Sequence, residues 1–271
     1  MSGFRSNIQN MLQETNGPGF SQSLERGLAI LSAFRPDRPA IGISELAREL
    51  GLTRSTTHRY VATLASLRYL EQEASTRRYR LGPRVLDLGF SVLGSLELRE
   101  IAAPHLQQLT DATGHTSNLA IRDDTDVILI DRVRGRPGRY HHLEFSLHVG
   151  SRLPSYCSAT GKALLAYLPQ PDLDRLLDRM ELVQRGPRTL TDKKSLIREL
   201  EKVRCTNIAT NDEELESALR SIAAPIRSRS GQVVAAVNLA IPWSPAAMSE
   251  LVSRLGPTVR AAANRIAAQV V

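Results

Sequence analysis

Apolar side chains recur every three or four positions near the start of the chain, and this spacing predicts helices. The first helix is expected to begin at Ser23 and to stop at the segment 35–39, which contains two prolines. Its predicted apolar stripe consists of Leu24, Leu28, Leu31 and Phe34. The preceding residues, 1–21, are polar and interrupted by Gly17-Pro18-Gly19, so we expect them to form a flexible arm.

Two further helices joined by a tight turn are predicted between residues 44 and 67. Ser44 is a suitable N-cap for the first of them, and Gly51 suits the left-handed position at which a helix ends. Thr53 can cap the second helix, which is expected to run from Arg54 to Leu67. The inward stripes are Leu46, Ala47 and Leu50 in the first helix and Thr57, Val61 and Leu64 in the second. The pattern indicates a helix-turn-helix.

The outward side of the second helix carries short, hydroxyl-bearing and basic side chains. The candidate DNA contacts there are Arg54, Ser55, Thr56, His58, Arg59 and Thr63, together with Ser44 on the preceding helix. Such a face has no bulky apolar group to bury and few carboxylates to repel phosphate, as entry into the DNA major groove requires. An ordinary helical hairpin with a solvated polar face would show the same spacing. The segment that follows it distinguishes a DNA-binding helix-turn-helix from this alternative.

Alternation of polar and apolar residues after residue 67 predicts a β-hairpin, with strands at 69–72 and 77–81 around a turn at 73–76. Arg77 and Arg78 lie at or beside its tip, and we take both as candidate DNA contacts. A basic hairpin directly after a helix-turn-helix is typical of a winged helix-turn-helix, whose wing contacts phosphate or a minor groove. Residues 22–82 are therefore predicted to form a DNA-binding domain.

The remainder of the chain predicts a linker helix at 83–96 and a mixed domain at 97–271, so the fold class is α+β. Helices are expected at 97–113, 158–168, 172–180, 192–204 and 245–270. Strands are expected at 115–121, 126–133, 142–149, 208–210, 221–227 and 233–241.

The charge distribution agrees with a polyanion-binding N-terminal domain. The net charge is +7, and 31 of the 35 basic residues are arginine. The first 95 residues hold 12 arginines and eight acids, so this third of the chain carries a net +4. A coding bias toward arginine would produce the same arginine usage. The sequence has no run of 18 apolar residues and no signal-peptide pattern, so we expect a cytoplasmic protein without a membrane segment.

The two cysteines, Cys157 and Cys205, have no metal-type spacing and cannot form a disulfide framework. We therefore expect no metal site and no cofactor. One alternative is an enzyme in which Cys157 acts as nucleophile, but no histidine stands in a recognisable partner motif. A second alternative is a DNA-binding regulator that responds to thiol oxidation at both cysteines. The prediction is a DNA-binding protein and not an enzyme.

Several long segments resemble the IclR family of bacterial transcriptional regulators. The runs GLTRSTTHRYVATLASLRYL (51–70) and YRLGPRVLDLG (79–89) resemble its DNA-binding half. The runs VGSRLPSYCSATGKALLAYLP (149–169) and ATNDEELESALRSIAAPIRSRSGQVVAAVNLAIP (209–242) resemble its central and C-terminal segments. The resemblance extends over residues 22–268. Residues 144–169 most resemble the branch that controls protocatechuate, 4-hydroxybenzoate and β-ketoadipate catabolism.

This resemblance implies a GAF-like or profilin-like sheet with an effector pocket on one face. It also implies a homodimer, or a dimer of dimers, on a pseudo-palindromic operator in double-stranded DNA. The family's effector positions correspond to Phe145, Leu153, Ala159, Thr160, Asn211, Leu219, Ser221, Asn238 and Ala240. Small-acid sensors of the family often have an acidic or hydroxyl residue where this chain has Asn211, Asn238 and Ala240. An aromatic or amide-bearing organic acid is therefore expected as effector.

The residues themselves leave two interpretations of the segment 154–162 open. Small side chains at the start of a helix let a ligand approach the backbone, and the helix dipole favours a carboxylate there. A plain capped helix would have the same composition. Arg134, His141 and His142 are candidates for pairing with a carboxylate, and the alternative is that all three are solvated surface residues.

Overall fold

The structure is a computed structural model that describes residues 20–35, 37–94, 97–135, 147–242 and 244–270. The chain divides into two compact units, Met1–Ser95 and Leu96–Val271. None of the helices within the described ranges is long and apolar enough to cross a membrane. All but the last two residues of the predicted N-terminal arm lie outside the described residues.

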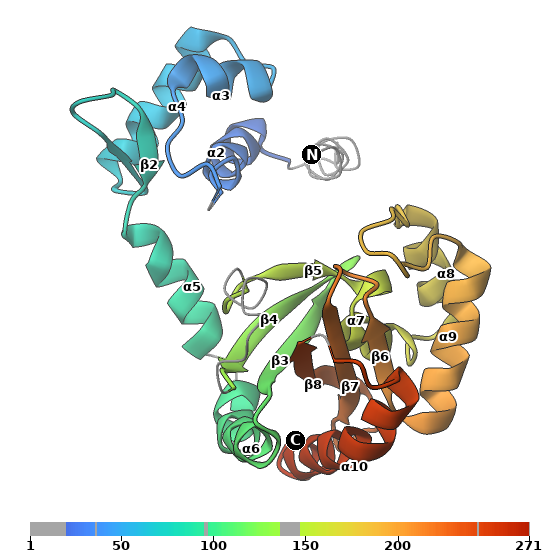
Figure 1. Ribbon diagram of the computed structural model, residues 1–271. Coiled ribbons are helices and arrows are strands. Elements are labelled where there is room, and N and C mark those ends of the chain that lie inside the picture. The colour runs from blue at the N-terminus through green and yellow to red at the C-terminus, as the bar shows by residue number, and fades with distance from the viewer. Residues whose placement is uncertain (1–19, 36, 95–96, 136–146, 243, 271) are drawn as a thin grey trace. The chain divides into compact units, whose positions relative to one another are not determined.

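The N-terminal unit is a winged helix-turn-helix, as the sequence predicted (Figure 1). Its elements are α2 (Gln22–Ser32), α3 (Ile43–Glu49), α4 (Arg54–Ser66), β1 (Leu70–Gln72) and β2 (Tyr79–Leu81). The two strands pair antiparallel and form the wing. A small apolar core joins the three helices to the wing, and it consists of Ile30, Ala33, Phe34, Ile41, Leu46, Val61, Leu70 and Tyr79. Each element therefore contributes at least one buried side chain to a common centre.

The predicted stripe of α2 was wrong in its N-terminal half. Leu24 and Leu28 are 63% and 54% exposed, whereas Ile30 and Phe34 are buried. The apolar core of the N-terminal unit contacts only the C-terminal half of α2. No part of that core therefore covers the side chains of the first turns of the helix. The helix also begins one residue earlier than predicted, because Ser21 is its N-cap.

The turn between α3 and α4 has both of its predicted capping residues, whereas the cap predicted for the start of α3 was wrong. Gly51 has a φ of +65°, which favours glycine, and the Thr53 hydroxyl accepts a hydrogen bond from the Thr56 backbone N–H at 3.2 Å. The prediction for Ser44 was wrong, because Gly42 is the N-cap of α3. Ile41 exchanges both backbone hydrogen bonds with Tyr79 of the wing. The backbone is therefore still extended at Gly42, and the helix begins at Ile43.

Helix α5 (Arg84–Gly94) forms where the linker helix was predicted. Leu86 and Leu88 are 58% and 54% exposed on it. Its role in joining subunits stays a prediction.

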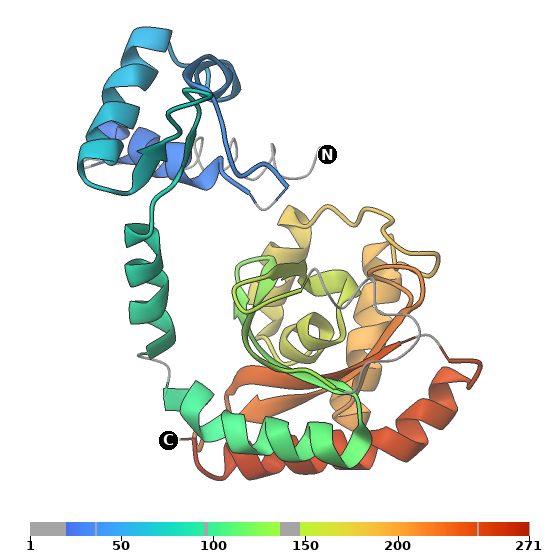
Figure 2. The ribbon, with the colours of Figure 1, turned by 60° about the vertical axis from the view of Figure 1, so that its left-hand side comes forward.

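The C-terminal unit is built on a six-stranded antiparallel sheet with the order β5-β4-β3-β8-β7-β6. The strands are β3 (Thr116–Asp123), β4 (Asp126–Val133), β5 (Arg152–Pro154), β6 (Ala209–Asp212), β7 (Leu219–Arg227) and β8 (Val233–Pro242). The helices are α6 (Glu97–Thr113), α7 (Ala159–Leu165), α8 (Gln170–Arg179), α9 (Lys193–Thr206) and α10 (Met248–Ala267), with a 3-10 turn η1 at Ser155–Cys157. Helices α6 and α10 lie side by side under one face of the sheet (Figure 2). Helix α7 packs on the other face.

Two predicted elements of this unit need correction. The strand predicted at 142–149 lies mostly outside the described residues, and residues 147–149 are not in a strand. The short edge strand β5 was missed instead, because three residues are too few to show alternation. The helix predicted at 158–168 is the shorter α7, preceded by η1. Gly161 lets the two pack closely, since a Cβ there would lie 2.2 Å from the Ser155 carbonyl oxygen.

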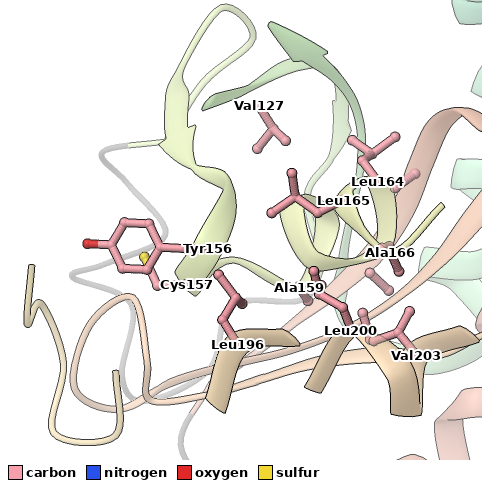
Figure 3. Close-up of a cluster of buried hydrophobic side chains, with 14 of the residues drawn as sticks. Val127, Tyr156, Cys157, Ala159, Leu164, Leu165, Ala166, Leu196, Leu200 and Val203 are labelled. Carbon is pink, nitrogen blue, oxygen red and sulfur yellow. The ribbon is translucent and has the colours of Figure 1, made fainter. Parts of the chain in front are cut away.

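All seven residues of α7 are buried. The helix lies between the sheet and α9, and Figure 3 shows the apolar side chains that fill this layer. The sheet presents small residues to α7, namely Ala120, Ala209, Ala223 and Ala236. Because methyl groups occupy little space, the helix axis can approach the strands closely, and α9 can then cover the helix from outside.

A buried ion pair fixes α7 to the turn that joins β6 and β7. Lys162 is fully buried, and its ammonium lies 2.6 Å from Oε1 of Glu214, which is 6% exposed. The turn is itself held in shape, because the side-chain oxygen of Asn211 accepts the backbone N–H of Glu214 at 2.8 Å. Removing the Lys162 ammonium would leave the Glu214 carboxylate without its partner in the core.

We therefore expect Lys162→Met to destabilise the protein by about 3–5 kcal/mol, because it strands the Glu214 carboxylate in an apolar layer. Lys162→Met combined with Glu214→Met should recover most of that loss, since neither member of the pair then carries a charge. Urea unfolding followed by circular dichroism measures both. The matched control is Lys202→Met, whose side chain is 74% exposed on α9. A Lys162→Met variant as stable as the control would contradict the structural role of the pair.

Candidate functional site

The outward face of α4 carries most of the predicted DNA contacts. Arg54, Ser55, His58, Arg59 and Thr63 are exposed. Thr56 is half-buried, and its hydroxyl accepts a hydrogen bond from the Thr53 hydroxyl at 2.8 Å, so it belongs to the helix cap as well as to the outward face. Ser44 is exposed on α3, although it does not cap that helix. Hydroxyl and basic groups are thus concentrated on one accessible side of the helix-turn-helix.

The two wing arginines have different surroundings. Arg77 is exposed and has a φ of +59°, which places it at the tight turn of the hairpin. Arg78 is half-buried, and its two terminal nitrogens each donate to a carboxylate oxygen of Glu45 at 2.9 Å. Its Nε and one terminal nitrogen also donate to the Ala40 carbonyl oxygen, at 3.2 and 2.9 Å. Arg78 therefore clamps the wing onto α3, and its contact with DNA stays a prediction.

The clamp is part of a larger charge network at the start of α3. Arg38 donates to Glu45 at 3.1 Å and also pairs with Glu49. Hydrogen bonds from Arg38 and then Arg78 lower the pKa of the Glu45 carboxyl, while the hydrogen bond to Glu49 raises the pKa of Arg38. Both shifts favour the charged forms, so the wing and α3 remain joined across the neutral pH range.

A second candidate site lies on the face of the sheet that α7 covers in part. Ala223 and Ala236 belong to the layer under α7, and alternation along the strands places Ser221, Asn238 and Ala240 on the same face. Cross-strand pairing aligns Asn118, Asn238, Ala223 and Ala209 in one row. It aligns Thr116, Ala240, Ser221 and Asn211 in the next row. Polar groups thus replace the alanines toward this end of the face.

Four of the nine predicted effector residues lie in these rows. These four are Asn211, Ser221, Asn238 and Ala240. Leu219 lies two residues before Ser221 on β7 and therefore on the same face. Leu153 is not part of this group, since it pairs with Val127 on the opposite edge of the sheet. The resemblance supplied its position along the chain but no information on strand order. Phe145, like His141 and His142, lies outside the described residues.

The start of α7 is a capped helix, which answers one question that the sequence left open. Ala159 and Thr160 are buried in its first turn. The Ser158 hydroxyl oxygen accepts the Gly161 backbone N–H at 3.2 Å, so the helix satisfies one of its own terminal donors. The capped helix is what the structure shows, and a carboxylate at this point stays a prediction.

Sequence reasoning missed two side chains on this face. Arg132 of β4 donates to the side-chain oxygen of Asn118 at 3.0 Å, and the Asn118 amide nitrogen donates to the side-chain oxygen of Asn238 at 2.8 Å. Asn118 and Asn238 are 120 residues apart in the chain. Strand parity could have assigned each one to a face, but only the strand order brings the three together.

The environment of Cys157 does not favour either alternative that involves it. The thiol is fully buried, and burial raises its pKa to about 12. A nucleophilic or redox-sensing cysteine needs a thiolate at neutral pH and access to its reactant, and this thiol has neither. Cys205 is exposed on α9. Among the described residues, no group of three or more His, Cys, Asp or Glu side chains could hold a metal ion.

Comparisons with known proteins identify both units. Residues 23–74 match the IclR helix-turn-helix domain, and residues 90–268 match the C-terminal domain described as bacterial transcriptional regulator IclR C-terminal. The chain is 35% identical to the Pca regulon regulatory protein of Pseudomonas putida, over 94% of this chain and 86% of that protein.

Solved structures agree over nearly the whole chain. An IclR family transcriptional regulator from Brucella abortus has a TM-score of 0.81 and 27% identity, covering 96% of each chain. An IclR homologue from Microbacterium hydrocarbonoxydans in complex with 4-hydroxybenzoate has a TM-score of 0.76 and 28% identity, covering 91% of this chain and 98% of the other.

The burial of Cys157 yields a test with a thiol reagent. We expect Ellman's reagent at pH 8 to modify Cys205 in the native protein and to leave Cys157 unmodified, because a thiol of pKa about 12 is protonated at that pH. Guanidinium chloride should then release the second thiol. Cys205→Ser is the matched control, and its native form should not react. Reaction of both thiols in the native protein would restore the redox alternative.

Proposed function

Because the chain belongs to the IclR family of bacterial transcriptional regulators, we propose a specific division of roles between its two units. The chain is a DNA-binding transcriptional regulator and not an enzyme. The N-terminal unit reads the operator, and the C-terminal unit binds an aromatic organic acid that alters operator binding. The buried polar rows on the sheet are the observation that carries the effector proposal.

In the proposed DNA complex, α4 lies in the major groove. Exposed Arg59 and the hydroxyl groups beside it contact base edges, and Arg54 and Ser44 contact the backbone at the ends of the two helices. Arg77 on the wing contacts phosphate. Arg78 contributes indirectly, because it fixes the wing to α3 through Glu45. The remaining candidates from the sequence, namely Ser55, Thr56, His58 and Thr63, keep their proposed place on the groove-facing side.

We also propose that the chain binds DNA as a homodimer, with two α4 helices in half-sites about one helical turn apart. Leu24 and Leu28 on α2, and Leu86 and Leu88 on α5, are each more than half exposed. Four exposed leucines on two helices of a small unit favour an apolar contact with a second subunit. A dimer of dimers would form through the C-terminal units.

The proposed effector is a small aromatic carboxylic acid. Its site includes Thr160, Asn211, Ser221, Asn238 and Ala240, where amide and hydroxyl groups stand among small apolar residues. Ala159 and Leu219 border these rows, and Phe145 and Leu153 remain in the proposal on the family resemblance alone. The aromatic class is supported by the similarity to a Pca regulon regulator and to a homologue that binds 4-hydroxybenzoate.

The effector acts by binding one quaternary arrangement of the subunits better than another. This differential affinity shifts the population that is competent for operator binding, with a coupling free energy of about 1–3 kcal/mol. The acid itself need not contact DNA.

Arg77→Ala is expected to weaken binding to operator and to unrelated DNA by similar factors, because phosphate contacts carry no sequence information. The slope of log K against log salt concentration should fall by about one. Fluorescence anisotropy at several salt concentrations measures the slope. Arg175→Ala is the matched control, since it removes an exposed arginine from the C-terminal unit. An unchanged slope for Arg77→Ala would argue against a wing contact.

A thermal-shift screen tests the effector proposal. Aromatic carboxylic acids should raise the melting temperature of the purified protein by mass action, and short-chain acids should raise it less. The shift should be lost in Asn238→Leu, because the leucine has no amide to donate. Asn264→Leu, at an exposed position of α10, is the control for the substitution itself. The effector proposal fails if no acid changes the melting temperature of a wild-type protein that still binds its operator.

A further inference from the structure

Three side chains form a directional hydrogen-bond relay across the centre of the sheet. Arg132, Asn118 and Asn238 stand directly opposite one another on β4, β3 and β8. Arg132 donates to Asn118 at 3.0 Å, and Asn118 donates to Asn238 at 2.8 Å. Asn118 is 2% exposed and Asn238 is 9% exposed, so water competes little with these hydrogen bonds.

The direction of the relay follows from chemistry at its first residue. A guanidinium group can only donate, so Asn118 must turn its side-chain oxygen toward Arg132. Its amide nitrogen then faces Asn238, which must turn its own oxygen toward Asn118. The amide nitrogen of Asn238 is consequently placed at the free end of the relay. Within the described ranges no side chain or carbonyl accepts a hydrogen bond from it.

The neighbours of Asn238 do not supply an acceptor on that side. Its cross-strand partner on β7 is Ala223, whose methyl group can neither donate nor accept. The relay therefore ends in an amide donor that has no partner in its own row. A ligand that brings a carboxylate oxygen to this point can accept a hydrogen bond from the oriented amide, and hydrogen bonds to charged acceptors are the stronger ones.

We propose that Arg132 is a positioning residue that sets the hydrogen-bond polarity of the effector site, so that Asn238 donates to a carboxylate oxygen of the ligand. This inference rests on the proposed effector-binding function. The positive charge at the start of the relay polarises both amides in the same direction and favours an anionic ligand further. Arg132 acts through Asn118 and Asn238, and it need not touch the ligand.

The ligand discrimination that follows is specific. A carboxylate offers an acceptor to Asn238, whereas the matching primary carboxamide can offer either its oxygen or its NH₂ group. With the relay in its native direction, the acid is preferred over the carboxamide. Reversing the relay would present the Asn238 oxygen instead, and the carboxamide would then gain relative to the acid.

Titration calorimetry of the full-length protein with 4-hydroxybenzoate and 4-hydroxybenzamide tests this inference. Arg132→Glu places an acceptor at the start of the relay, so Asn118 and Asn238 both turn over. We expect the acid-to-amide affinity ratio to fall at least tenfold. Arg132→Lys retains a donor-only group, so it should keep the wild-type preference. Circular dichroism and operator binding establish that each variant is folded.

Arg132→Glu changes the local charge as well as the direction of the relay, and two controls separate these two effects. Arg122→Glu makes the same charge change at an exposed position of β3. In an Asn118→Leu background there is no relay to reverse, so adding Arg132→Glu should change the affinity ratio less than twofold. An equal fall in both backgrounds would mean that charge alone acts, and it would overturn the inference.

The outcomes also separate this inference from the proposed function. A wild-type protein that binds neither these compounds nor any acid of the thermal-shift screen contradicts the effector proposal, and the relay assignment fails with it. A wild-type protein that prefers the acid, with the same preference in Arg132→Glu, contradicts the relay assignment alone. A reduced ratio in Arg132→Glu, with the native ratio in Arg132→Lys, supports both.

Discussion

The buried ion pair between Lys162 and Glu214 is the interaction on which the C-terminal unit depends. A charge enclosed in an apolar layer is tolerated only when it is paired, so this contact fixes α7 to one turn of the sheet. Once α7 is fixed, it packs on the alanines of the face, and Asn238 lies in the same cross-strand row as two of them, Ala209 and Ala223. The position of the proposed effector site thus follows from where the helix is held.

The N-terminal unit uses charge in a comparable way. A three-stranded or larger sheet would hold a wing by its own core, but two strands of three residues each cannot. Glu45 compensates, because it joins α3 to the wing through Arg78 and to the preceding loop through Arg38. The exposed Arg77 is therefore presented from a fixed hairpin.

Local periodicity predicted the elements better than it predicted their contacts. The turn between α3 and α4, the cap at Thr53 and the strand β4 follow from neighbouring residues, and the sequence located them. The exposure of Leu24 depends on how far a core extends, and the pairing of Arg78 depends on a carboxylate 33 residues away. The same limit applied to the candidate site, because Leu153 shares its face with Asn238 but not its end of the sheet. Strand order and packing depth are properties of the assembled chain.

Recognition of an acid in this fold is better assigned to the sheet than to the helix. Helix α7 has only seven residues, and Ser158 already satisfies one of its terminal N–H groups. The sheet offers a donor whose direction is fixed by a guanidinium two side chains away. A helix start attracts any anion, whereas an oriented amide distinguishes an acceptor from a donor at one atom of the ligand. Chemical selectivity is therefore expected to originate in the strands, and α7 serves to close the apolar side of the site.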